Sequence, residues 1–198
     1  MFVLMPWVPT AGMILRWFRD EFCNGIDYDA MIKSATKVPP GSDGLILLPH
    51  FSGMNSPDIN PEAKGVFYGM TTAHHKGHFV RAILESVAFS LRDNIELLEE
   101  SGTSCKGIIS LGGAARSSFW LQIKSDVLQK QIKTMRCEET TSLGTAILVA
   151  AGTGKFANIA DAVKAMIHPA ATVEPDLAND RIYDNVFKQY KDLNRRLF

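Results

Sequence analysis

The pattern of apolar and polar positions is clearest between residues 76 and 100. Apolar side chains recur there every three or four positions, which places them on one face of an α-helix. Serine and glycine at 101 and 102 are typical of a helix C-terminus, because glycine readily adopts the left-handed conformation that ends many helices. The pattern predicts one long amphipathic helix with these residues on its buried face: Val80, Leu84, Val87, Leu91, Ile95 and Leu98.

The second half of the chain alternates short apolar runs with helical patterns. The runs at residues 107–111 and 132–136 are typical of buried strands, and a glycine pair marks the turn after the first. Strands that alternate with helices indicate the α/β class. A further apolar run predicts a strand at 44–48. We predict the remaining helices over these segments: 10–22, 28–35, 117–130, the alanine-rich stretch that ends at Gly152 and Gly154, and the tail through Tyr183, Phe187, Tyr190 and Leu197.

Two stretches fall outside these patterns. Residues 49–65 combine proline, glycine, asparagine and serine, which predicts a long ordered loop of a kind that is often functional. The apolar N-terminal run has no basic residue before Arg16 and is interrupted by Pro6 and Pro9, so it fits neither a signal peptide nor a membrane span. We expect residues 1–9 to be an interior strand whose unpaired edge favours homodimerisation.

Composition narrows the class of protein. With 198 residues, 46% of them apolar and 21% charged, the chain has the size and make-up of one globular domain. Its 21 basic and 21 acidic residues cancel, so no global field would attract nucleic acid or an anionic membrane. Three cysteines without a C-x-x-C pair suggest neither a disulfide framework nor a zinc site. We therefore expect a cytoplasmic protein with no nucleic-acid or membrane partner.

The glycine pair lies in the sequence LGGAARS, residues 111–117, between a predicted strand and a predicted helix. Glycine lets backbone N–H groups approach a ligand closely, and the N-terminus of the following helix favours negative charge. A phosphate or one edge of a nucleotide would fit there. A plain tight turn has the same sequence pattern, so the pair alone leaves both interpretations open.

A longer motif brings a family resemblance. GVFYGM at residues 65–70, followed after seven residues by HFVRAILE at 78–85, resembles the second signature of the FGGY carbohydrate kinase family in spacing and in residue types. The similarity extends over essentially the whole chain and is greatest to the xylulokinase branch. The other matching segments follow in order: 10–12, 16–20, 48–49, 52–53, Pro57, 111–114 and 143–146.

The resemblance implies a ribonuclease-H-like domain of the actin and hexokinase superfamily. Residues 1–198 would be the C-terminal nucleotide-binding domain of an ATP-dependent kinase for a sugar such as D-xylulose, without the first strands of that domain. The family's N-terminal domain, with most sugar contacts and the aspartate base, has no counterpart here. The resemblance therefore implies ATP and Mg²⁺ held jointly with that domain, no catalytic residue in this chain, and no activity of the chain alone.

Four residues match nucleotide-contacting positions of the family. Gly12 corresponds to a position whose backbone lines the phosphates, and Arg16 to a nucleotide-contacting side chain one turn later. Gly113 corresponds to the adenosine-motif glycine, and Ser117 to a position facing the adenine. The residues themselves also allow simpler roles, because Arg16 could be a solvated helix residue and Ser117 a plain N-cap.

Other polar residues are interpreted structurally. The histidines at 74, 75 and 78 resemble a metal cluster, but hydrogen bonding explains His78 better because the signature also accepts other polar residues there. Arg81 and Glu85, one helical turn apart, predict an ion pair at the domain interface. The two glutamates at 138–139 precede a helix start, where negative charge is favourable without any function.

Two other functions compete with the kinase interpretation. A non-catalytic nucleotide-binding or interaction module would keep the glycine turn without supporting catalysis. A dinucleotide-dependent oxidoreductase is disfavoured, because no glycine triplet after a strand is followed by an acidic residue about 20 positions on.

Overall fold

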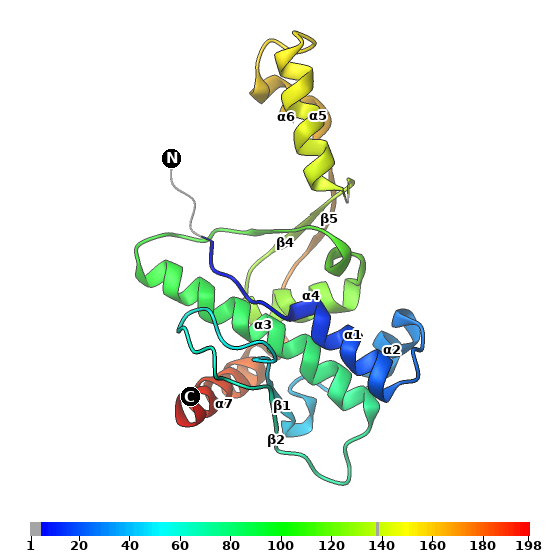
Figure 1. Cartoon of the computed structure of the whole chain (residues 1–198), viewed down its shortest axis with the longest axis vertical. Helices are drawn as coiled ribbons and strands as arrows, with labels where there is room; N and C mark the ends of the chain where they lie inside the picture. Colours follow the sequence, from blue (N-terminus) through cyan, green and yellow to red (C-terminus); the bar gives the residue numbers. More distant parts are fainter. Residues whose placement is uncertain (1–4, 138) are drawn as a thin grey trace.

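A long central helix organises the structure, a computed structural model that describes residues 5–137 and 139–198. This helix, α3 (Lys76–Glu100), packs against α1 (Ala11–Phe22), α2 (Tyr28–Ala35) and α4 (Ser118–Leu128). Figure 1 shows α3 crossing the middle of the body with the other helices around it. The helix predicted at 76–100 is confirmed, because apolar residues that recur every three or four positions lie on one side of a helix.

The start of α3 is fixed by local hydrogen bonds and by a close helix contact. His75 caps the helix by accepting from the Gly77 N–H, and the His78 side chain accepts from the His75 N–H. A Cβ on Gly77 would lie 2.5 Å from the carbonyl oxygen of Ser34, so glycine is needed where α2 crosses. The hydrogen-bonding role predicted for His78 is confirmed, and its Nε2 also lies 3.0 Å from Oδ2 of Asp43.

The strands form two small sheets. Strands β1 (Ile46–Leu48) and β2 (Val66–Tyr68) pair antiparallel, with Ile46 opposite Tyr68. Strands β3 (Ile108–Ser110), β4 (Ile132–Met135) and β5 (Pro169–Val173) form a sheet in the order β3-β4-β5, in which β3 and β4 are parallel and β4 and β5 antiparallel. The α/β class and the strands predicted at 44–48, 107–111 and 132–136 are confirmed, whereas β2 and β5 had no strand pattern long enough to be predicted.

Helices α5 (Thr140–Gly152) and α6 (Ile159–Met166) form a hairpin that projects from the body at the ends of β4 and β5 (Figure 1). They pack chiefly against each other. Ile147 is the buried residue of α5 and Ala162 that of α6, while Leu148 and Val149 are more than half exposed. The hairpin therefore presents apolar side chains to solvent.

The last helix, α7 (Asp180–Leu197), closes the core of the body. Its buried face consists of Tyr183, Phe187 and Tyr190, whose rings pack around Phe89 of α3. The predicted terminal helix and its apolar stripe are confirmed. In the described part of the chain, short 3₁₀ helices connect the larger elements: η1 (Ser42–Gly44), η2 (Gly113–Arg116) and η3 (Leu177–Asn179).

A buried ion pair joins α3 to α7. Arg81 Nε lies 2.8 Å from Glu85 Oε1, and both side chains are almost completely buried. Arg81 also donates to the carbonyl oxygen of Val38 and to the Tyr183 hydroxyl, at 2.6 and 2.8 Å. The predicted ion pair is confirmed, but its predicted place at a domain interface is wrong, because both side chains are buried within the core of this chain.

The expectation of an interior strand at residues 1–9 is wrong for the part that the structure describes. Residues 5–9 form no strand, and Met5 and Trp7 are 85% and 61% exposed. Pro6 and Pro9 lack the backbone N–H that a central strand donates, which disfavours such pairing here. Residues 1–4 lie outside the described part of the chain. Within the described residues, no helix has the length and apolar character needed to cross a membrane.

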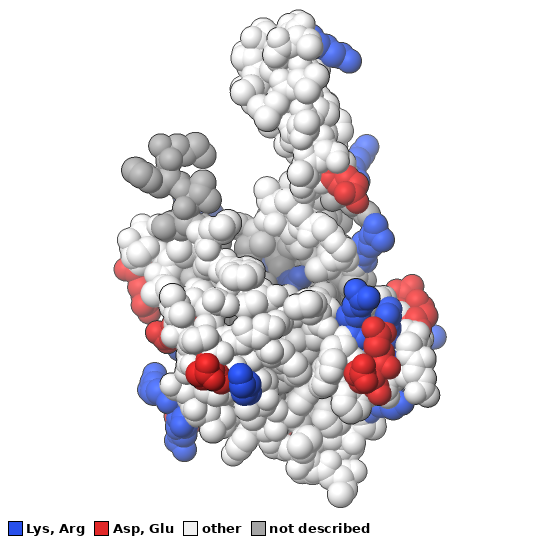
Figure 2. Space-filling view, viewed as in Figure 1, with Lys and Arg blue, Asp and Glu red and all other residues white. Residues whose placement is uncertain are grey.

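Charged side chains are dispersed over the surface. Figure 2 shows lysines and arginines mixed with aspartates and glutamates around the body, with no broad field of one sign on this face.

The predicted loop at 49–65 is irregular, with isolated bridges that pair Phe51 with Gly53 and Met54 with Asn60.

Candidate functional site

A cavity of about 1000 Å³ opens among α1, α2, α3 and the turn before α4. Three of the four predicted nucleotide-contacting residues line it: Gly12 in the first turn of α1, Gly113 in η2, and Ser117 just before α4. Gly12 and Gly113 are about a hundred residues apart in sequence, so tertiary packing brings two separate glycine segments to one cavity.

Both glycines leave room for a ligand. A Cβ on Gly12 or on Gly113 would meet no atom within 4 Å. The preceding Gly112 has φ of +76°, a conformation that favours glycine, and it turns the chain from β3 into η2. Gly112 therefore allows the turn of the backbone, and Gly113 leaves the space beside it free.

Ser117 caps α4, since its hydroxyl oxygen accepts from the Trp120 N–H at 3.2 Å. The N-cap interpretation of this residue is confirmed. Because the first N–H groups of a helix have no partner inside the helix, and because the helix dipole is positive at this end, the position also favours an anion or a hydrogen-bond acceptor.

Arg16 does not line this cavity. Its side chain is 72% exposed, lies 3.7 Å from the Asp20 carboxylate one turn later, and borders a different depression beside Trp17. The structure therefore does not bring Arg16 to the cavity that Gly12 and Gly113 line, and its contact with a nucleotide stays a prediction. Helical spacing from Gly12 placed it near the same face, but its flexible side chain extends toward an opposite charge.

Helices α3 and α4 give the cavity a lining that is mostly apolar, with Val87, Leu91 and Ile95 from α3 and Trp120 from α4. Two polar residues that sequence analysis missed also line it: Asn94 of α3, and Lys124, one turn beyond Trp120. Burial lowers the pKa of Lys124 to about 8. The sequence spacing could have indicated this burial, because Ser117, Trp120 and Lys124 share one face of the predicted helix.

The remaining polar candidates form no metal site. No group of three or more His, Cys, Asp or Glu within residues 5–137 and 139–198 could hold a metal ion. Glu139 stands at the N-cap of α5 without a side-chain hydrogen bond, and Glu138 lies outside the described residues.

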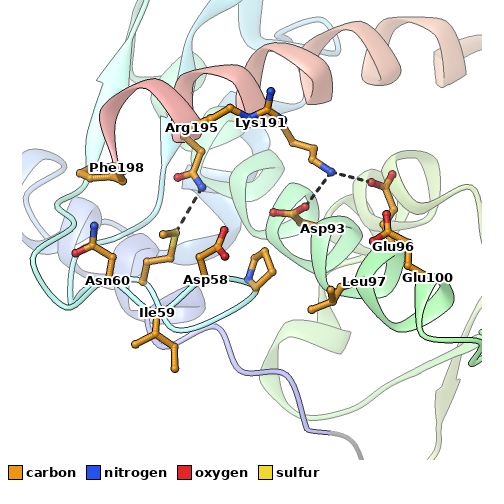
Figure 3. A pocket seen from close by; sticks show the side chains of 13 residues that line it. Asp58, Ile59, Asn60, Asp93, Glu96, Leu97, Glu100, Lys191, Arg195 and Phe198 are labelled. Atoms are coloured by element: carbon orange, nitrogen blue, oxygen red, sulfur yellow. Dashed lines mark hydrogen bonds and ion pairs between the residues drawn. The ribbon is translucent and has the colours of Figure 1, made fainter.

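A second cavity, of about 580 Å³, lies between the predicted loop, the end of α3 and the end of α7 (Figure 3). Lys191 Nζ bridges two carboxylates there, at 3.3 Å from Asp93 Oδ1 and 3.2 Å from Glu96 Oε2. Burial raises the pKa of Asp93, and Lys191 opposes that effect. The bridge therefore gives Lys191 and both carboxylates charged partners within the chain.

Comparisons with known proteins identify the family of the chain. Residues 2–153 match the C-terminal domain of the FGGY family of carbohydrate kinases. The chain belongs to this family. The FGGY domain is 32% identical to a xylulose kinase of Bacillus subtilis over 93% of its own length and 37% of that protein. It is 35% identical to a gluconokinase of the same species, over 96% of its length and 39% of that protein.

Solved structures show the same fold. A xylulose kinase from Rhodospirillum rubrum superimposes with a TM-score of 0.83 at 29% identity, covering 94% of the FGGY domain and 38% of that chain. Glycerol kinase from Plasmodium falciparum, solved with ADP, gives 0.79 at 25% identity over 96% and 37%. The actin- and hexokinase-like fold is therefore confirmed, and the chain spans less than two-fifths of the relatives it matches.

Proposed function

We propose that this chain supplies the nucleotide-binding half of an ATP-dependent carbohydrate kinase that acts on a sugar such as D-xylulose. The observation that carries the proposal is the meeting of Gly12, Gly113 and Ser117 around one open cavity. The relatives named as xylulose kinases support D-xylulose as the acceptor. In this proposal residues 1–198 form one domain, which lies in the cytoplasm and pairs as a homodimer.

The residues of the cavity would bind and orient the nucleotide. Without a Cβ at Gly12 and Gly113, backbone N–H groups can come close to phosphate or adenosine. The N-termini of α1 and α4 add partial positive charge at the same cavity. Phosphoryl transfer depends mainly on positioning and charge stabilisation, so a half-site of this kind does useful work once the acceptor is held opposite it.

The described lining of the same cavity offers few groups for acid–base or metal chemistry. Among the described residues that line it, the carboxylate is Asp29, which is exposed on α2. These residues do not fit a Mg²⁺ site by themselves, because Mg²⁺ is usually held by carboxylates together with substrate phosphates. We propose that Mg²⁺, the general base and the sugar are held by residues outside this chain, and that the chain alone does not turn over.

Two measurements on the purified chain test this function. Calorimetric titration with ATP should show binding, and an assay for ATP-dependent phosphorylation of D-xylulose should show no turnover. Turnover by the 198-residue chain would contradict the proposal that the general base lies outside this chain. Absence of ATP binding would instead favour the competing interpretation of a non-catalytic interaction module.

A further inference from the structure

Three histidine rings meet where α3 begins. The ring centres of His75 and His78 lie 4.2 Å apart, and those of His74 and His78 lie 5.1 Å apart. His78 is 7% exposed, and its Nε2 faces the carboxylate of Asp43 in η1. In the described structure these residues lie outside the lining of the glycine-lined cavity, so the cluster is a separate feature of the domain.

Each of the three rings uses Nδ1 as a hydrogen-bond acceptor. Nδ1 of His74 accepts from the Thr71 N–H at 3.0 Å. Nδ1 of His75 accepts from the Gly77 N–H, and Nδ1 of His78 from the His75 N–H, both at 3.2 Å. A backbone N–H can only donate, so each Nδ1 carries a lone pair and no proton. These hydrogen bonds therefore require all three imidazoles to be neutral.

The other ring nitrogen, Nε2, carries the proton and connects the cluster to η1. Nε2 of His78 lies 3.0 Å from Oδ2 of Asp43, and Nε2 of His74 lies 3.3 Å from the backbone carbonyl oxygen of the same residue. Both partners are acceptors, so Nε2–H donates. Gly69 packs so closely on the carbonyl oxygen of Gly44 that it leaves no room for a Cβ. Residues 69–78 are therefore closed onto η1.

Few negative charges are available to compensate positive charge on these rings. Asp43 is the carboxylate in contact with them in the described structure, and its side chain is 55% exposed. Helix α2 packs on the start of α3, where the Ser34 carbonyl lies against Gly77. The other charged residues of these neighbouring segments are Lys33, Lys37, Lys76, and Arg81 with its partner Glu85.

We propose that η1 and residues 69–78, here called the histidine corner, form a proton-sensitive closure at the start of α3. Imidazole takes up a proton between about pH 8 and pH 5. Because Nε2 already carries a proton, the added one goes to Nδ1, where it faces the backbone N–H that donated to it. Protonation therefore breaks the three hydrogen bonds and brings like charges together, so the corner opens while the rest of α3 stays folded.

The sign of the pH dependence follows from these hydrogen bonds. The closed corner binds fewer protons than the open corner, so lowering the pH favours the open form. This device goes beyond the proposed function and does not depend on it, because none of its hydrogen bonds involves the glycine-lined cavity.

Hydrogen exchange of the full chain, measured peptide by peptide, tests the proposal. Protection is expressed relative to an unstructured peptide at the same pH, which removes the direct effect of pH on exchange. Peptides that cover residues 69–79 should lose about tenfold protection or more between pH 7.5 and pH 5.5, as expected for the loss of at least one net hydrogen bond. Peptides from α4 and α7 should lose much less.

A double variant provides a matched control. His75→Ser combined with His78→Gln keeps a capping box at the start of α3, with a hydroxyl and an amide oxygen that accept hydrogen bonds and take up no proton. Protection of the histidine corner should then depend much less on pH. His168→Gln removes an exposed histidine elsewhere and should keep the response of the wild type.

Three results would overturn the proposal. The first is constant protection of the histidine corner in the wild type between the two pH values, and the second is a loss spread equally over the chain. The third is a loss in the double variant as large as in the wild type. Circular dichroism at pH 7.5 checks that the double variant is folded. If it is not, His78→Gln alone replaces it and should show a smaller pH response than the wild type.

Discussion

The Tyr183 hydroxyl lies 3.1 Å from Oε1 of Glu85, although the two residues are 98 positions apart in the sequence. The contact connects the last helix to the ion pair at the centre of α3. Glu85 accepts three more hydrogen bonds at 2.8 to 2.9 Å, from Arg81 and from the turn that carries Gly41 and Ser42. One carboxylate thus joins three segments of the core.

Replacing the carboxylate of Glu85 should destabilise the fold strongly. Glu85→Gln leaves Arg81 buried without its counter-charge, and breaking such a pair costs about 3–5 kcal/mol. The free energy of unfolding, measured in urea, should fall by that order. Asp20→Asn, which removes the exposed partner of Arg16, should cost less than about 1 kcal/mol.

A milder variant isolates the contact with α7. Tyr183→Phe removes the hydroxyl and keeps the ring, so a loss of about 1 kcal/mol is expected from the hydrogen bonds alone. Equal unfolding free energies for the wild type, Glu85→Gln and Tyr183→Phe would show that the network does not hold the core.

His50 should make stability depend on pH. Burial lowers the pKa of His50, and the hydrogen bond to Asn194, with Nε2 2.7 Å from Oδ1, opposes the shift. The folded state therefore takes up this proton at lower pH than the unfolded state does, so stability is lost as the pH falls below about 6.5. The contribution cannot exceed about 1.4 kcal/mol per pH unit.

Unfolding in urea at pH 7.5 and pH 5.5 measures this effect. The decrease in free energy between the two values should be larger for the wild type than for His50→Gln, which cannot ionise. An identical decrease in both proteins would assign the pH dependence to other groups.

Gly113→Val should abolish nucleotide binding without unfolding the chain. The space above Gly113 is open, so a valine side chain would occupy the cavity and meet no neighbouring atom at its Cβ. Calorimetry should show at least about a tenfold loss of ATP affinity, or about 1.4 kcal/mol. Gly152→Val, at an equally open position at the end of α5, is the matched control and should bind ATP like the wild type.

The chain should associate with itself at high concentration. Met5 and Trp7 are exposed, and a net charge of zero provides little repulsion between copies. Light scattering over a concentration series should show dimers, and Trp7→Ser should shift the equilibrium toward monomers. Leu177→Ser, which removes another exposed apolar side chain, should not. A monomer at all concentrations would contradict homodimerisation.

The elements that the sequence predicted are those with a repeating pattern. Helix α3 could be placed from its sequence because its apolar positions repeat over seven turns. Strand β5 (Pro169–Val173) could not be, because its residues are mostly exposed and include a proline, so its pairing with β4 depends on a contact between distant segments.

The candidate site was predictable to a similar extent. Gly12, Gly113 and Ser117, which the structure brings to one cavity, could be predicted because close approach of the backbone requires residue types that a motif records. The direction of a long side chain leaves no such record, and the side chain of Arg16 borders a different depression from the one that Gly12 lines. Lys124 was missed because a lysine normally indicates a solvated face, and its burial follows from packing of α4 against α3.

The projecting hairpin of α5 and α6 should unfold locally before the rest of the chain does. Each of its helices buries one residue, whereas α3 buries residues along most of its length. Segments with few buried contacts unfold locally at a lower free energy than the whole domain. Amide hydrogens of the hairpin should therefore exchange with solvent through an opening that leaves α3 and α7 intact, so the hairpin behaves as a separate cooperative unit.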